Sequence, residues 1–247
     1  MMTTLIAGIT GGIGHAMAAQ LLADDHDAHL IGLARSASGN EELAELAARY
    51  PHRMTLLDAD VANPEGLKQA LQQLPKELKI TRVIYAIGLL HDAAMTPEKR
   101  LADIDIQSMA HSYQVNTLGF LSLVQGLVPW LRHREAKTIV ALSAKVGSLS
   151  DNRFGGWYAY RCSKAALNMA VRNLAIEAQR GLRPSTVIAL HPGTTATPLS
   201  APYQQSLAKL KVHTPQETAR NLWVVIHSLT ETQNGCFLNW DGSELPW

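Results

Sequence analysis

Tyr160 and Lys164, in the run Tyr160-Arg161-Cys162-Ser163-Lys164, are the residues whose types and spacing could support chemistry. They stand four positions apart in a segment with helical periodicity, so their side chains should share one helix face. A free phenol has a pKa of about 10, and a nearby ammonium favours the phenolate and lowers that pKa. Tyr160 could then exchange a proton with a carbonyl oxygen. The spacing alone is also that of an ordinary surface pair on a helix.

Two further polar residues could complete such a site. Ser143 ends a predicted strand, and its hydroxyl could orient and polarise a substrate carbonyl. Asn116 lies in the preceding predicted helix, and its amide could order a water that links the lysine to bulk solvent. Separately, they could be a strand-end turn residue and a polar helix residue. Their order along the chain, together with a glycine-rich turn, favours one shared catalytic site.

That turn lies near the amino terminus. Gly8, Gly12 and Gly14 follow an apolar run and open a predicted helix with the spacing G-x-x-x-G-x-G. Glycines let the backbone turn tightly and approach a pyrophosphate, and a helix N-terminus supplies N–H donors and a positive dipole. An ordinary glycine-rich turn is the alternative, but the position after the first strand favours dinucleotide binding.

Arg35, after the second predicted strand, bears on the choice of cofactor. An NAD site prefers an acid here, whereas an arginine can pair with a 2′-phosphate. We therefore expect NADPH in preference to NADH, with a solvated surface arginine as the alternative. Asp60 could accept a hydrogen bond from the adenine amino group or serve as a turn residue. Three more residues are expected to contact the cofactor: Ile13, Val61 and Gly88.

The rest of the chain predicts the sheet that positions these residues. Short apolar runs alternate with longer amphipathic segments, which indicates an α/β fold: a single doubly wound, Rossmann-type domain with a seven-stranded parallel sheet and helices on both faces. The expected strands are 5–8, 28–34, 54–58, 82–87, 138–143, 185–191 and 236–240. The expected helices are 13–24, 41–50, 64–74, 108–132, 158–180 and 214–229.

Composition limits the remaining possibilities. The 247 residues carry a net charge of +1, which gives no strong basic field for nucleic acid. We expect residues 1–247 to form one domain, with 194–213 as a loop over the substrate or an ordinary surface connection.

Two cysteines and no apolar run of membrane-spanning length predict a cytoplasmic protein without a membrane partner. His26 and His29 lie in a predicted loop far from the site, so we expect no metal.

These residues resemble the short-chain dehydrogenase/reductase family over nearly the whole chain, and they are most similar to its C-factor-like and sniffer-like carbonyl reductases. The closer likeness lies in the stretch from Ser143 to Asn168. The resemblance matches the family's motifs to the glycine turn, Asn116, Tyr160, Lys164 and Pro192-Gly193. It implies that Thr195 and Thr197 lie near the nicotinamide amide. In the family the two long helices form dimer interfaces, which implies a homodimer or homotetramer.

The chain departs from the family pattern in two places. The family's N-N-A-G is Tyr85-Ala86-Ile87-Gly88 here, so only the glycine survives and local repacking is expected. The family's serine position, three residues before Gly147, is Ala144. Ser143 stands one residue earlier, and adjacent strand residues point to opposite faces. Ser143 is the leading candidate for the catalytic serine, and Ser148 is the alternative.

The sequence thus predicts NADPH-dependent reduction of a small-molecule carbonyl, or the reverse oxidation. Tyr160 would act as the general acid/base, Lys164 would tune it and hold the ribose, Ser143 would polarise the carbonyl, and Asn116 would support a proton relay. The alternative is a non-catalytic, dinucleotide-binding sensor on the same fold, which the altered serine and N-N-A-G regions motivate. A methyltransferase on a Rossmann-type fold is disfavoured by the tyrosine–lysine pair.

Overall fold

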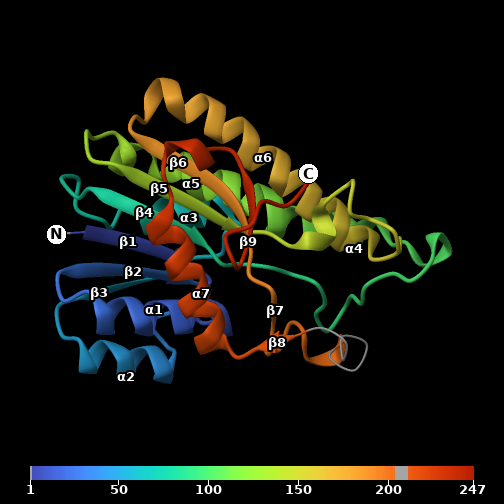
Figure 1. The fold of residues 1–247 in the computed structure, drawn as a ribbon. Helices are drawn as coiled ribbons and strands as arrows, with labels where there is room; N and C mark the ends of the chain where they lie inside the picture. Colours follow the sequence, from blue (N-terminus) through green and yellow to red (C-terminus); the bar gives the residue numbers. More distant parts are fainter. Residues whose placement is uncertain (1, 204–210) are drawn as a thin grey trace.

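The structure is a computed structural model, which describes residues 2–203 and 211–247. A seven-stranded parallel sheet forms the central layer, with the strand order β3-β2-β1-β4-β5-β6-β9 (Figure 1). Its strands are β1 Met2–Ala7, β2 Ala28–Ala34, β3 Met54–Asp58, β4 Ile80–Tyr85, β5 Lys137–Leu142, β6 Ser185–His191 and β9 Phe237–Asn239. Two short strands, β7 Thr194–Thr195 and β8 Val212–His213, pair separately. The predicted parallel sheet is confirmed.

Helices cover both faces of this sheet (Figure 1). One face carries α1 Gly12–Asp24, α2 Glu41–Arg49 and α7 Pro215–Ser228. The other carries α3 Pro64–Leu71, α5 Gly119–Leu131 and α6 Tyr158–Gly181, with α4 Ile106–Tyr113 packed against α6. Short 3-10 turns occupy 101–103, 145–147, 201–203 and 231–233. The arrangement is the doubly wound, Rossmann-type fold that the sequence predicts.

The strands are apolar throughout because both faces of the sheet are buried. Leu5 and Val83 point into the layer beneath α3, α5 and α6. Ile6 and Ile84 point into the layer beneath α1, α2 and α7. This alternation along each strand divides the apolar side chains between two core layers.

Local capping chemistry sets where several helices begin. Asn63 accepts a hydrogen bond from the Gly66 amide, and Pro64 occupies the first turn of α3. At α7, Thr214 and Glu217 form a reciprocal capping box, with the Glu217 amide 3.1 Å from Thr214 Oγ1.

The prediction of one continuous α-helix over 108–132 is wrong. The helical run begins at Ile106, and a π-helical segment, Gln114–Leu118, separates α4 from α5. The Tyr85 hydroxyl donates a hydrogen bond to the Val115 carbonyl. The Val115 carbonyl thus has a hydrogen-bond partner outside the helix. This contact lies within the π-helical segment. The spacing of apolar residues along the sequence does not predict a single π-helical turn.

Tyr85 also shows the repacking expected at the altered N-N-A-G segment. Its ring is fully buried and lies 5.6 Å, centroid to centroid, from the ring of Phe120 in an edge-on arrangement. A Cβ on Gly119 would lie 2.5 Å from the Tyr85 hydroxyl, so only glycine fits there. A large aromatic side chain thus fills this place in the core beside the π segment.

The strand order fixes where a ligand site can form. The chain leaves β1 toward β2 and β3, and then returns to place β4 on the other side of β1. Connections diverge at this switch point, which opens a crevice outside the carboxyl ends of the strands. Gly8 follows β1, Gly88 lies beyond β4, and Ser143 follows β5 at the same edge.

Candidate active site

A cavity of about 450 Å³ lies at the carboxyl edge of the sheet. Its walls include five of the predicted residues, which are Ile13, Ser143, Tyr160, Thr195 and Thr197. A larger cleft of about 580 Å³ lies at the opposite edge, among residues at the amino ends of β1, β4 and β5 such as Met2, Arg82 and Thr138. The cavity at the carboxyl edge is therefore the candidate active site.

Tyr160 and Lys164 come together in the first turns of α6. Both are buried, and the Lys164 Nζ lies 5.8 Å from the centroid of the Tyr160 ring. Burial lowers the pKa of Lys164 to about 7 and raises the pKa of Tyr160 above that of a free phenol. Burial thus opposes the lowering of the Tyr160 pKa that a neighbouring lysine would cause, because burial disfavours the phenolate. At neutral pH the Tyr160 phenol therefore keeps its proton.

Lys164 is held in place by the sheet. Its Nζ donates a 2.8 Å hydrogen bond to the carbonyl of Leu142, the last residue of β5. A Cβ on Gly88 would lie 3.8 Å from the same Nζ, so the segment after β4 approaches the lysine closely. The structure thus brings two of the predicted residues, Lys164 and Gly88, side by side.

The start of α6 is fixed by an unusual backbone segment. Trp157 precedes the helix with a φ of 49°, in the left-handed region that bulky residues rarely adopt. The buried Glu98 carboxylate accepts a 3.2 Å hydrogen bond from the Ala159 amide. The Trp157 ring lies 6.4 Å from the ring of Tyr160 and 5.1 Å from that of Tyr203. The segment thus places aromatic side chains beside Tyr160.

The two candidate serines have different surroundings. Ser143 lines the cavity, and its hydroxyl donates a 2.6 Å hydrogen bond to Asn168 Oδ1 on α6. Ala144, at the family's serine position, lines the cavity as well. Ser148 is buried after the 3-10 turn, and its hydroxyl accepts a 3.1 Å hydrogen bond from the Asp151 amide. The catalytic role of either serine stays a prediction.

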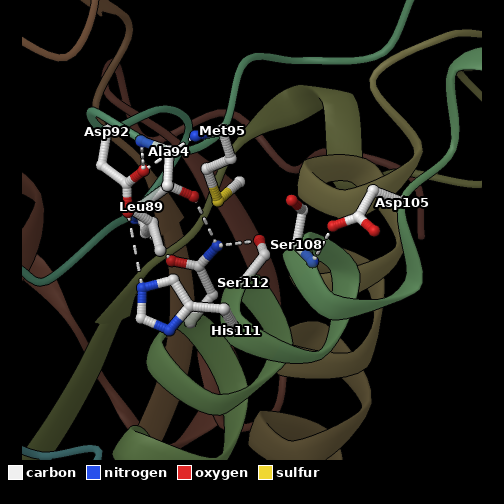
Figure 2. A network of polar contacts seen from close by, with 9 residues as sticks. Leu89, Asp92, Ala94, Met95, Asp105, Ser108, His111 and Ser112 are labelled. Atoms are coloured by element: carbon white, nitrogen blue, oxygen red, sulfur yellow. Dashed lines mark hydrogen bonds and ion pairs between the residues drawn. The ribbon is translucent and has the colours of Figure 1, made fainter.

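Asn116 lies in the π-helical segment and is fully buried. Its Oδ1 accepts a 2.7 Å hydrogen bond from the Leu89 amide, and its Nδ2 lies 2.8 Å from the Leu89 carbonyl. Nδ2 also contacts the hydroxyls of Ser112 and Ser163 at 3.1 and 2.9 Å. Figure 2 shows Leu89 and Ser112 in this network. Asn116 therefore ties the loop after β4 to the helix that carries Tyr160.

The same loop is braced further along the chain (Figure 2). Asp92 accepts hydrogen bonds from the amides of Ala94 and Met95, and its carboxylate lies 3.6 Å from the His111 ring nitrogen. His91 contacts the carbonyl of Leu199, a cavity-lining residue, at 3.1 Å. The loop after β4 and the segment after β7 are thus joined.

The glycine turn has the shape that a bound phosphate needs. Gly8 has a φ of +89°, and a Cβ on Gly14 would clash with the Gly8 carbonyl oxygen. Gly11 caps α1 without a side-chain hydrogen bond, so the first-turn N–H groups have no side-chain cap. Gly12 lies against Thr197, since a Cβ there would be 3.0 Å from Thr197 Cγ2. The turn therefore fits a dinucleotide pyrophosphate.

The remaining predicted cofactor residues lie at the edge of the site. Arg35 is exposed and directly follows β2. Asp60 is exposed, and its Oδ1 accepts a 2.8 Å hydrogen bond from the Ala62 amide, as in an Asx turn. Val61 is buried against the Gly119 position. These residues do not line the cavity, and their contacts with a cofactor stay predictions.

The segment predicted to cover the substrate lines the cavity in its described part. Thr197, Leu199 and Tyr203 contribute to the wall. Thr195 is buried, and its hydroxyl lies 2.8 Å from that of Thr218 on α7. Residues 204–210 of the predicted loop lie outside the described residues.

Three ionisable residues of the cavity wall are not among the site residues predicted from the sequence. Lys145 follows Ala144, Arg161 follows Tyr160, and His191 precedes Pro192-Gly193. Burial, reinforced by the charges of Lys145 and Lys164, lowers the pKa of His191 to about 4. Their adjacency to the motif residues was the available signal. It was unused because adjacent residues usually point in different directions.

Residues 2–203 and 211–247 contain neither a membrane-spanning helix nor a cluster of metal ligands. None of the helices there combines the length and the apolar character needed to cross a membrane. The same residues contain no group of three or more histidine, cysteine, aspartate or glutamate side chains that could hold a metal ion.

The chain has relatives among known proteins. The chain is 35% identical over 149 residues to C-signal of Myxococcus xanthus, covering 60% of this chain and 83% of that protein. It is 28% identical over 249 residues to 1-hydroxy-2-glutathionyl-2-methyl-3-butene dehydrogenase of Rhodococcus sp. strain AD45, covering all of both chains.

Solved structures show the same fold. The carbonyl reductase Sniffer of D. melanogaster superposes with a TM-score of 0.87 at 24% identity, covering all of both chains. An NADPH-bound carbonyl reductase from chicken fatty liver gives 0.85 at 24% identity, covering 99% of this chain and 98% of that one. Residues 2–208 match the family model for short chain dehydrogenase. The chain therefore belongs to the short-chain dehydrogenase/reductase family of NAD(P)-dependent oxidoreductases.

Proposed function

We propose that this enzyme reduces a carbonyl compound with NADPH, and that Tyr160 is the general acid. One observation carries the proposal: Tyr160 lines a cavity and is buried beside Lys164, at the sheet edge where the turn after β1 fits a pyrophosphate. The names of the two solved carbonyl reductases support the same substrate class. A non-catalytic sensor has no need of a buried phenol paired with a lysine at a cavity.

The side chains have distinct tasks in this proposal. The nicotinamide cofactor supplies a hydride to the carbonyl carbon. Tyr160 is protonated at neutral pH, as any phenol is and the more so because burial raises its pKa, and it donates its proton to the carbonyl oxygen. Lys164 would hold the cofactor ribose and return a proton to Tyr160, and Asn116 would support this proton relay. Ser143 orients the carbonyl oxygen, and the segment from Thr194 excludes water.

Substitution of Tyr160 tests the proposal. Absorbance of NADPH would be followed with a panel of aldehydes, ketones and quinones, and Tyr160→Phe should lower kcat by on the order of 10²–10⁴. Tyr113→Phe, an exposed tyrosine on α4, is the matched control and should retain full activity. Turnover that survives Tyr160→Phe would overturn the mechanism, and tight NADPH binding without turnover of any carbonyl would favour the sensor.

The preference for NADPH rests on Arg35. A guanidinium at the end of β2 can form charge-assisted hydrogen bonds with a 2′-phosphate, which NADH lacks. An NADP-bound relative from Burkholderia multivorans has the same fold, with a TM-score of 0.82 at 23% identity. We retain NADPH over NADH as the proposed cofactor.

Assembly and location belong to the same proposal. Met169 and Ile176 on α6 and Leu121 on α5 are exposed apolar side chains on the helices expected to form an interface between copies. Their exposure supports a homodimer or homotetramer. Cys162 and Cys236 are free thiols, which supports a reducing, cytoplasmic compartment.

A further inference from the structure

One side of the active-site cavity is basic. Lys145, in the 3-10 turn after β5, and Arg161, the residue after Tyr160, both line it. Asp151 lines the cavity too, and its Oδ1 lies 3.6 Å from the Lys145 Nζ. The structure shows no carboxylate of a described residue within ion-pair distance of Arg161. Two cations and one carboxylate leave one net positive charge on this wall.

The same wall contains two buried polar atoms without partners. The Arg161 Nη1 donates a 3.2 Å hydrogen bond to the Val146 carbonyl, but its Nε has no hydrogen-bond partner among the described residues. The Nδ1 of His191 is likewise buried and unpartnered within that part of the chain. A buried donor without a partner costs free energy of about 1–3 kcal/mol. Arg161 lines the cavity, so the guanidinium donors that these contacts leave free can meet a ligand that supplies acceptors.

His191 is neutral at neutral pH because burial and two nearby lysines lower its pKa to about 4. A neutral imidazole offers one N–H donor and one acceptor, so it adds a hydrogen bond to the wall without adding charge. Lys145, Arg161 and His191 are called the basic subsite below.

Other lining residues of the cavity are apolar or aromatic. They include Leu90, Trp157, Leu199 and Tyr203, and the Trp157 and Tyr203 rings lie 5.1 Å apart. A ligand that fills the cavity must therefore combine an apolar body with a group that accepts hydrogen bonds from a guanidinium. A carboxylate meets this need, because it binds arginine through charge-assisted hydrogen bonds.

We propose that the basic subsite recognises a carboxylate on the substrate, so that the enzyme prefers carbonyl compounds with an apolar or aromatic body and an acidic group. This inference rests on the carbonyl reduction proposed above. Tyr160 faces the carbonyl, the apolar and aromatic lining residues hold the body, and Arg161 and Lys145 bind the carboxylate at the cavity wall beside Tyr160.

A matched pair of aldehydes tests the proposal with the full chain and NADPH. 4-Carboxybenzaldehyde and methyl 4-formylbenzoate share the ring and the aldehyde and differ in one substituent, which is a carboxylate in the first and an uncharged methyl ester in the second. The acid should have a kcat/KM about 10–100-fold above that of the ester, as expected for one charge-assisted contact. Arg161→Gln and Lys145→Gln should each lower this acid-to-ester ratio by about tenfold, and Arg161→Lys should restore part of it.

Arg180→Gln is the control, since it removes one exposed positive charge from the last turn of the same helix. It should leave the ratio unchanged. A wild-type ratio near one, or a ratio that Arg161→Gln and Lys145→Gln leave unchanged, would overturn the basic subsite while carbonyl reduction stands. Because the ratio is an internal reference, a general loss of activity in a variant does not imitate the expected result.

If neither aldehyde is reduced, the proposed function fails for this substrate class. A measurement of ligand binding then tests the basic subsite. Calorimetric titration of benzoate and benzamide into the wild-type chain and Arg161→Gln provides this measurement. Tighter benzoate than benzamide binding that Arg161→Gln abolishes would support the basic subsite. Equal binding of the two ligands, or binding unaffected by the substitution, would overturn it.

Discussion

The Ser143 hydroxyl donates its proton to the Oδ1 of Asn168, at 2.6 Å, and both side chains are buried. The Nδ2 of Asn168 has no hydrogen-bond partner among the described residues. A half-turn of the amide would place Nδ2 beside Ser143 as a donor. The serine would then accept from Asn168 and direct its own proton into the cavity that it lines.

This relationship makes Ser143 testable against Ser148. Ser143→Ala should lower kcat/KM for carbonyl reduction by about 100-fold, because one donor to the developing oxyanion is lost. Ser148→Ala should change it by less than about threefold, since the Ser148 hydroxyl accepts from the Asp151 amide on the far side of the 3-10 turn. Steady-state kinetics of both variants decides, and the reverse order of effects would assign the role to Ser148.

The glycine turn should be intolerant of a single methyl group at Gly14. A Cβ there would clash with the Gly8 carbonyl, so Gly14→Ala should lower the free energy of unfolding by about 1–3 kcal/mol and weaken NADPH binding. Gly181→Ala is the control, because a Cβ at this last residue of α6 meets nothing within 4 Å. Urea denaturation and NADPH titration measure the two effects. Equal stability and equal NADPH affinity of the two variants would contradict the close approach of Gly14 to the Gly8 carbonyl.

Arg35 should distinguish the two nicotinamide cofactors. Arg35→Ala should raise the Kd for NADPH by about 10–100-fold, because charge-assisted hydrogen bonds to the 2′-phosphate are lost. The Kd for NADH should change little. Arg49→Ala, which removes another exposed arginine from the end of α2, should alter neither constant. Fluorescence titration gives both values, and an unchanged NADPH affinity would show that Arg35 is a solvated surface residue.

Lys164 should make the stability of the cofactor-free protein depend on pH. Burial lowers its pKa from 10.5 to about 7, so between these values the unfolded chain binds a proton that the folded chain lacks. The free energy of unfolding of the wild type, relative to Lys164→Met, should therefore rise as pH increases from about 7 toward 10.5. Urea denaturation at pH values of about 6.5, 8 and 9.5 measures this difference. A difference independent of pH would show that Lys164 keeps its ordinary pKa.

The exposed apolar side chains of α6 should govern assembly. Met169→Glu should shift the protein from a dimer or tetramer toward monomer, because a carboxylate would be buried without a partner at the interface. Val224→Glu on α7, where the wild-type valine is also exposed, should leave the assembly unchanged. Sedimentation at micromolar concentration compares the variants, and a monomeric wild type would remove the interface.

Several elements could be predicted from the sequence because their causes are local. The buried strands read as apolar runs, and α3 and α7 begin at Pro64 and Pro215, after capping residues. The Gly8–Gly14 turn is likewise predictable from its residue types, since only glycine tolerates its backbone conformation and close contacts. The tyrosine–lysine spacing places both side chains on one face of α6 wherever that helix lies.

The sequence by itself determined the family, the parallel sheet and the pair Tyr160–Lys164, because each depends on short-range periodicity or on residues at fixed spacing. Only the tertiary structure decided the direction of the Tyr160 pKa shift, the π segment at Asn116 and the partner of Ser143. It also brought Lys145, Arg161 and His191 to one cavity wall from two helical segments and a strand end. Burial and long-range contacts arise only when distant segments pack, so they cannot be predicted from local sequence patterns.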